Sequence, residues 1–276
     1  MGVFQNNLLA ASAAAASAGG AGFYDYQIEQ SMRFDRNINE ALTRTPGSAG
    51  NRRTLTISFW LKRAEIDQFQ TAILQSDDPN TVNRTSSINF LTEGNGTGIG
   101  GTISFGLNGG NESVAYSSGR YRNTSGWMHL VHRIDTTQST NTNRTRSYIN
   151  GSLISYGDSP GTTSYPSQNY QTGFCSTSQI VVGGNTNANF NYPIAGYMAE
   201  VILADGTSYA PTQFGETKNG VWIPKDPSGT SFGTTGFHLK FENASDLGND
   251  SSGNNNDFST SAGADHQVLD SPTFGS

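Results

Sequence analysis

The chain has 276 residues, of which 14% are charged, well below the share of about 25% in an ordinary soluble domain. Its 16 lysines and arginines are outnumbered by 22 aspartates and glutamates, which leaves a net charge of −6 at pH 7. Because phosphate binding needs clustered basic side chains, this composition excludes nucleic acid as a partner. The single cysteine, Cys175, excludes an intrachain disulfide.

The first 22 residues, MGVFQNNLLAASAAAASAGGAG, contain no charged residue. A secretory signal peptide is one interpretation, but such peptides begin with positive charge, and the first basic residue here is Arg33. The stretch is also too short and too weakly apolar to span a bilayer, so no membrane partner is expected. We predict an uncharged, alanine-rich arm over residues 1–22 that attaches the protein to a neighbouring subunit, anchored by Phe4, Leu8 and Leu9. A disordered tail is the alternative.

From Tyr24 onward the hydrophobic pattern has a period of two, which predicts strands. Thr54–Lys62 alternates apolar and polar residues and reads as a half-buried strand. Asn150-Gly151 predicts a type I′ hairpin turn, because both central positions of that turn need a positive φ. Many short strands with frequent turns predict a two-sheet antiparallel sandwich. Its predicted core consists of Leu55, Ile57, Phe59, Leu61, Leu130, Ile134, Ile149, Val181, Val201, Leu203, Phe237 and Phe241.

Residues 157–177 form a long polar loop, and loops of this length are often contact surfaces. Tyr156, Tyr165, Tyr170 and Phe174 lie in or beside this loop. Their rings are suited to stacking on sugars or on a neighbouring subunit. Packing of the loop onto its own sandwich is the alternative.

Five segments carry a resemblance to a known family: TLTISFWLKR from Thr54, GWMHLVHRI from Gly126, SYINGS from Ser147, the long run from Phe190 to Lys225, and DLGNDSSGNNNDF from Asp246. Together they resemble the laminin G-like, concanavalin A-like jelly-roll domains of virion structural proteins from marine tailed bacteriophages of the cyanophage and pelagiphage type. The resemblance implies an all-β jelly roll over residues 23–260, with residues 261–276 as a C-terminal tail.

Catalysis is not expected. Glucanases of this fold class carry Glu-x-Asp-x-(x)-Glu on their active strand, and Glu65-Ile66-Asp67 begins that pattern. Gln70 then stands where the second glutamate belongs, and an amide cannot transfer the proton that glycoside hydrolysis requires. His129 and His132 would lie on opposite faces of one strand and so cannot share a metal.

The family resemblance also implies a calcium loop. In some laminin G-like domains a segment similar to DLGNDSSGNNNDF contributes oxygen ligands to calcium. Asp246, Asp250, Asn254 and Asp257 supply oxygens of the kind that Ca²⁺ prefers. The alternative is an Asx turn with no metal, in which these side chains bond their own backbone.

The family resemblance therefore implies a non-enzymatic structural protein of a phage virion, assembled in the host's bacterial cytoplasm. Capsid decoration is the favoured role, because the chain has no repeat or coiled-coil shaft. Its expected partners are other virion proteins, on capsid or tail, and further copies of itself. The alternative is a glycan-binding adhesin or tail-fibre protein, with cell-surface glycans as partners.

Overall fold

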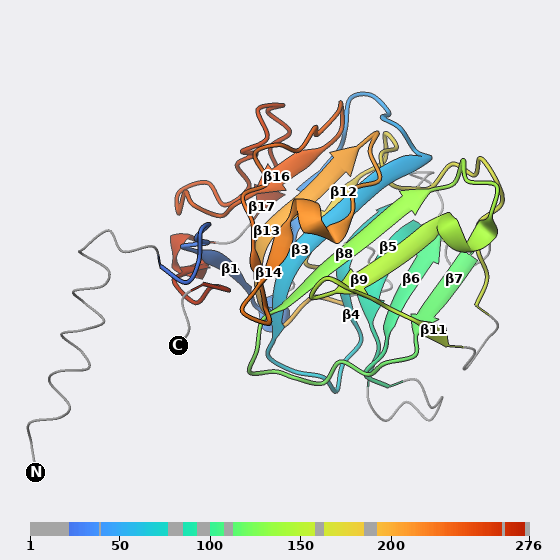
Figure 1. Cartoon of the computed structure of the whole chain (residues 1–276). Helices are drawn as coiled ribbons and strands as arrows, with labels where there is room; N and C mark the ends of the chain where they lie inside the picture. The colour runs from blue at the N-terminus through green and yellow to red at the C-terminus, as the bar shows by residue number, and fades with distance from the viewer. Residues whose placement is uncertain are drawn as a thin grey trace, which may run out of the picture.

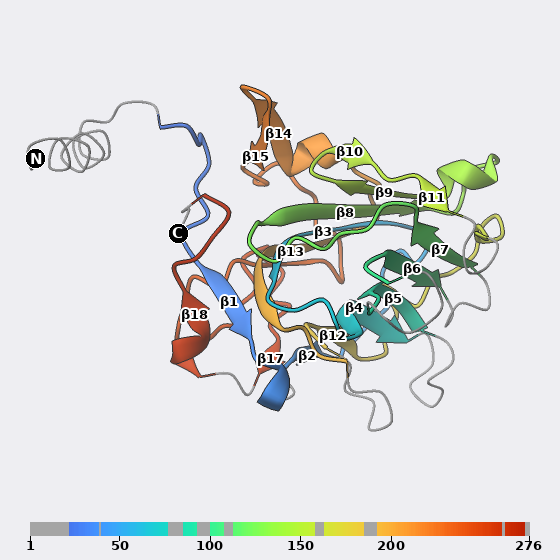
Figure 2. The ribbon, with the colours of Figure 1, turned by 90° about the horizontal axis from the view of Figure 1, so that it is seen from below.

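A computed structural model of the chain describes residues 22–38, 40–76, 85–92, 100–107, 113–157, 163–184, 192–260 and 263–273. Within these residues, two antiparallel sheets of eight strands each lie face to face (Figure 1). The second view shows the two layers edge-on, with β3, β8 and β9 in one layer and β4 to β7 in the other (Figure 2). The chain thus has the predicted all-β jelly-roll architecture. Phe4, Leu8 and Leu9, the predicted anchors of the arm, lie outside the described residues.

The first sheet, sheet A, has the strand order β10-β9-β8-β3-β13-β1-β18, with β16 also paired to β13. Its long central strands are β3 and β13, which pair along most of their length. Sheet A consists of β1 (Ser31–Phe34), β3 (Thr54–Arg63), β8 (Met128–Asp135), β9 (Thr145–Ile149), β10 (Ser152–Leu153), β13 (Gly196–Asp205), β16 (Phe237–Leu239) and β18 (Gln267–Val268).

The second sheet, sheet B, has the order β11-β7-β6-β5-β4-β12-β2-β17. It consists of β2 (Leu42–Arg44), β4 (Gln70–Ser76), β5 (Thr85–Phe90), β6 (Ile103–Leu107), β7 (Ser113–Ser117), β11 (Tyr156–Gly157), β12 (Ile180–Val182) and β17 (Ser259–Thr260). A separate hairpin of β14 (Gly215–Lys218) and β15 (Val221–Pro224) stands on the far side of sheet A (Figure 2). The 3-10 helices are η1 (Arg36–Ile38), η3 (Asn141–Asn143), η4 (Pro211–Gln213) and η5 (Ala264–His266). None of the helices in the described part of the chain is long and apolar enough to cross a membrane.

The main core lies between the two sheets. Phe59 and Leu61 from β3 belong to one apolar cluster with Ile88 and Phe90 from β5 and Phe105 from β6. All side chains predicted from the sequence to form the core are buried, except Ile149, which is half-buried and packs against the same cluster. The period of two therefore identified the inner faces of the longer strands, whereas Val181 in the short strand β12 is buried outside this cluster, which contains its neighbours Ile180 and Val182.

The outer face of sheet A, which is turned away from sheet B, is also covered. The sequence predicts β3 to be half-buried, and this is wrong: Thr56, Ser58 and Trp60 on its outer face are as inaccessible as the core side chains. Trp60 packs with Ile28 from the N-terminal segment and Trp222 from the β14–β15 hairpin. A strand pattern of alternating polarity reports on one face only, and segments distant in sequence bury the other.

The C-terminal segment is part of the sandwich. Residues 261–276 are predicted to be a tail, but β18 pairs with β1 in the register Ser31↔Val268 and extends sheet A. Beyond β18, Thr273 Oγ1 accepts a hydrogen bond from the Ile28 amide at 3.0 Å. A strand of two residues shows no periodicity, which is why the sequence pattern does not reveal it.

The predicted hairpin turn joins β9 to β10. Asn150 and Gly151 have φ values of 47° and 76°, as a type I′ turn requires. Glycine is needed at position 151 for a second reason: a Cβ there would lie 2.4 Å from the ring of Trp222. The turn therefore packs tightly against the β14–β15 hairpin.

Candidate functional site

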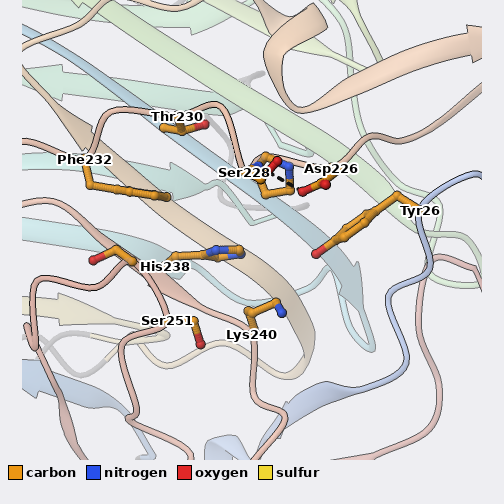
Figure 3. Close-up of a pocket in the computed structure, with 10 residues that line it drawn as sticks. Tyr26, Asp226, Ser228, Thr230, Phe232, His238, Lys240 and Ser251 are labelled. Atoms are coloured by element: carbon orange, nitrogen blue, oxygen red, sulfur yellow. Dashed lines mark hydrogen bonds between the residues drawn. The ribbon is translucent and has the colours of Figure 1, made fainter.

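A pocket opens on the outer face of sheet A, where the N-terminal segment meets three segments from residues 226–252 (Figure 3). Its volume is about 350 Å³, within the range of small-molecule sites. One wall comes from the N-terminal segment, one from the loop after β15, and the floor from β16. The lining residues are Tyr26, Asp226, Pro227, Ser228, Thr230, Phe232, His238, Lys240, Ser251 and Ser252.

A β-bulge in β13 places Glu200 beneath this pocket. The register between β13 and β3 shifts between Ala199 and Ile202, so Glu200 is an extra residue on the outer face. Its φ of 50° is left-handed, which is uncommon for a residue other than glycine and costs about 1 kcal/mol. Strain of this kind concentrates at functional sites. Here it directs a carboxylate out of a strand whose neighbouring residues are apolar.

Glu200 accepts two hydrogen bonds from side chains that line the pocket. One of its oxygens lies 2.5 Å from His238 Nε2, and the other accepts the hydroxyl of Tyr26 at 3.1 Å. Glu200 and His238 are only 6% and 5% exposed. Because Nε2 faces the carboxylate, this pair fixes the orientation of the imidazole ring in the floor of the pocket.

Tyr26 is held as a neutral phenol. Burial raises its pKa far above the ordinary value, and the negative charge of Glu200 adds to this effect. The segment that carries Tyr26 is fastened on both sides. Lys218 Nζ donates to Asp25 Oδ1 at 2.9 Å, and Ile28 bonds the C-terminal segment through Thr273. The Tyr26 wall is therefore supported by both the hairpin and the chain's far end.

The opposite wall is loop 225–236, which carries Phe232. Figure 3 shows the rings of Phe232 and Tyr26 on opposite sides of His238. The Phe232 and His238 rings are nearly parallel, with 17° between their planes and 6.0 Å between their centres. Asp205 anchors this loop, because its Oδ2 accepts hydrogen bonds from the backbone amides of Thr234 and Thr235. Two aromatic walls with polar groups between them can hold a ring that is apolar on its faces and polar at its edge.

The predicted calcium loop forms the remaining side of the pocket, through Ser251 and Ser252. Asp250 accepts hydrogen bonds from the amides of His238, Ser252 and Asn256 and from the Ser252 hydroxyl. These hydrogen bonds are those of an Asx turn.

The four predicted calcium ligands do not converge as a set. Asp257 Oδ1 accepts the Asp250 amide, Asn254 donates its side-chain amide to two backbone carbonyls, and Asp246 is exposed. The charges of Asp250 and Asp257 also act on Arg44, where they oppose the lowering of its pKa by burial. The described residues contain no group of three or more His, Cys, Asp or Glu side chains that could hold a metal ion.

The aromatic side chains of loop 157–177 lie elsewhere. Phe174 is fully buried in the main core, so its prediction as a contact residue is wrong. Tyr156 turns its hydroxyl inward, 2.8 Å from Ser147 Oγ, and packs against the core. Tyr165 and Tyr170 are partly exposed, with Tyr165 6.3 Å from Tyr156 between ring centres. The packing of this loop onto its own sandwich therefore accounts for most of its aromatic side chains.

The histidines of β8 are structural, and they lie on opposite faces as predicted. His129 stacks on Trp60 on the outer face, and His132 stacks on Phe105 between the sheets. Burial lowers the pKa of each to about 3, so both rings are neutral. Trp222 Nε1 donates to His129 Nδ1 at 3.0 Å, which leaves Nε2 to donate to Ser58. Burial also raises the pKa of the Cys175 thiol, as expected for an inert side chain.

The glucanase-like segment has no catalytic geometry. Glu65 forms an ion pair with Arg36 at 2.5 Å. Gln70, at the position of the missing glutamate, is buried and accepts a hydrogen bond from Arg63.

Sequence reasoning missed the pocket residues Tyr26, Phe232 and His238, because no sequence motif links the three segments that carry them. The Glu200 carboxylate did leave a signal. It is the one charged residue between Tyr197 and Ala204, and a lone carboxylate within an apolar strand requires a partner.

Residues 38–208 match the family model described as the concanavalin A-like lectin/glucanases superfamily. No curated protein sequence matches the chain. Among solved structures, a protein of Bacteroides ovatus described as a candidate carbohydrate binding protein aligns with a TM-score of 0.59 and 14% identity. The alignment covers 91% of this chain and 63% of that one, so the chain spans less than two thirds of its length.

Two further structures are less similar. The heptameric SAP-like pentraxin of Limulus polyphemus aligns with a TM-score of 0.45 and 15% identity, covering 68% of this chain and 81% of that one. Tailspike protein 2 of an Escherichia coli O157:H7 bacteriophage aligns with a TM-score of 0.42 and 13% identity, covering 67% and 23%. At these identities the similarity concerns the fold alone.

Proposed function

Since the chain belongs to the concanavalin A-like lectin/glucanases superfamily, we propose that it is a non-enzymatic carbohydrate-binding module. The proposed binding site is the pocket on the outer face of sheet A. The observation that carries the proposal is the arrangement of Tyr26 and Phe232 around a polar floor formed by His238, which Glu200 holds from beneath. Sugar rings combine apolar C–H faces with hydroxyl edges, and this arrangement matches both.

The state of the pocket carboxylates supports binding rather than hydrolysis. Glycoside hydrolysis uses a pair of carboxyl groups, one of which donates a proton while shielded from water. Both oxygens of Glu200 are engaged by Tyr26 and His238, and Asp226 is exposed. Neither carboxyl group is arranged as a general acid.

Display on a phage particle, on capsid or tail, stays a prediction from the sequence. Immunogold labelling of purified particles would locate the protein.

The binding proposal is tested with a glycan array and the full chain, comparing two aromatic truncations. Phe232→Ala removes one wall of the pocket, and we expect at least about tenfold weaker binding to every glycan that the parent chain retains. Tyr165→Ala removes a partly exposed ring from the loop that the sequence favoured, and should leave binding unchanged. Urea unfolding of both variants controls for stability.

Two outcomes would contradict the proposal. If the parent chain binds no glycan on the array, the proposed carbohydrate-binding function is wrong. Loss of binding in Tyr165→Ala, with Phe232→Ala unaffected, moves the site to loop 157–177.

A further inference from the structure

We propose that the pocket accepts neutral and amine-bearing saccharides and discriminates against acidic ones, and that Asp226 sets this preference. The inference rests on the proposed carbohydrate-binding function and names the ligand class of the same site. It is carried by the charged groups that surround the pocket, which come from three segments: β13, loop 225–236, and β16 with the residues that follow it.

Negative charges face the pocket from β13 and from loop 225–236. Glu200 lies beneath the floor, and Asp226 lies at the rim, where it is exposed. The positive charge of Lys240 is offset by Glu242, whose Oε2 lies 3.2 Å from Nζ. His238 Nε2 is paired with Glu200 Oε2 at 2.5 Å and so is turned towards this carboxylate beneath the floor.

The pKa of Tyr26 reflects the electrostatic field of these charges at the wall of the pocket. Burial is the main cause of its raised pKa, and the charges of Glu200, Asp226 and Glu242 each raise it further. The field of these three carboxylates thus disfavours a negative charge at the Tyr26 hydroxyl. A carboxylate or sulfate on a bound sugar would meet the same field.

Asp226 is the one of these three carboxylates that lines the pocket. One of its oxygens accepts the backbone amide of Ser228 at 2.9 Å, drawn as a dashed line in Figure 3. A sugar hydroxyl or ammonium group at the rim can donate to this carboxylate, whereas an acidic group would face a like charge. The aromatic faces of Tyr26 and Phe232 also attract cations and repel anions.

The test is an array on which each neutral oligosaccharide stands beside its sialylated, sulfated or uronate counterpart and beside its de-N-acetylated amine form. For the parent chain we expect the acidic counterparts to bind at least about fivefold more weakly than the neutral forms at low salt. The difference should shrink at 0.5 M NaCl, because salt screens exposed charges.

Asp226→Asn keeps the shape of the side chain and removes its charge. We expect it to reduce the ratio of the affinities for neutral and acidic forms by about threefold. Binding of the amine forms should become weaker. Asp265→Asn is the matched control: this carboxylate is 78% exposed on η5 and does not line the pocket. It should leave all ratios unchanged.

Equal binding of acidic and neutral forms by the parent chain, or equal effects of the two variants, would overturn the inference. In either case Phe232→Ala would still weaken binding by at least about tenfold, so the proposed function would stand. Binding that Phe232→Ala leaves intact would instead refute the pocket itself.

Discussion

The two faces of sheet A are both buried, but by different means. The inner face packs against sheet B through side chains that alternate regularly along the strands, such as Ile57, Phe59 and Leu61. The outer face is covered by the N-terminal segment, the β14–β15 hairpin and loop 225–236. The inner face supplies a uniform apolar core, whereas the outer face mixes aromatic rings with a bonded carboxylate. We infer that the inner face provides stability and the outer face provides the site.

The largest effect should come from acid. His129 and His132, one on each face of β8, stay neutral in the folded protein down to a pKa of about 3. In the unfolded chain they titrate near pH 6.5. Between these two pKa values the unfolded state binds more protons than the folded state, so the free energy of unfolding decreases as the pH is lowered. From pH 6 to pH 4 we expect the two histidines together to remove about 5 kcal/mol of unfolding free energy.

Urea unfolding at several pH values measures this loss. His129→Gln and His132→Asn each keep a hydrogen-bonding nitrogen near its place, and each should remove about half of the dependence. If one variant alone removes the whole pH dependence of the unfolding free energy, the two faces of β8 do not exclude water equally.

The second prediction compares core and surface. Phe59→Ala truncates a fully buried side chain on the inner face, and should lower the unfolding free energy by about 3–5 kcal/mol. Leu153→Ala serves as the control, because this side chain is 57% exposed and should change stability little. Urea denaturation gives both values. A small effect of Phe59→Ala would contradict the division between the two faces.

The third and smallest effect concerns the strain at Glu200. Glu200→Ala should cost about 1–3 kcal/mol through its lost hydrogen bonds to Tyr26 and His238. Glu200→Gly loses the same bonds but adopts the left-handed φ without penalty, so it should be more stable than the alanine variant by about 1 kcal/mol. A glycine variant less stable than the alanine variant would show that the bulge is not strained.

The inner face could be predicted from the sequence, because its information is local. Period-two alternation in β3 and β8 identifies which side chains point inward, and Asn150-Gly151 identifies a hairpin. The fold class follows from such elements. The outer face could not be predicted in the same way, since a pattern in β3 cannot report that Trp222 will cover Trp60.

The candidate site could not be predicted from the sequence for the same reason, with the exception of one residue. Tyr26 and Phe232 are separated by about two hundred residues and belong to segments without periodicity. The Asp-Ser-Ser-Gly motif stands out in the sequence as a candidate calcium loop. In the structure its aspartate, Asp250, accepts hydrogen bonds from backbone amides and so shapes the pocket wall. Only Glu200, a lone carboxylate in an apolar strand, could have pointed to the site directly.

The pairing of β1 with β18 also has a mechanical consequence. The first and last strands of the described chain lie side by side at one edge of sheet A (Figure 2), and Ile28 is bonded to Thr273 beyond them. A pulling force applied through the residues before Gly22 would reach Tyr26 before it reaches β1. Such a force would therefore act on the pocket wall before it acts on the paired strands.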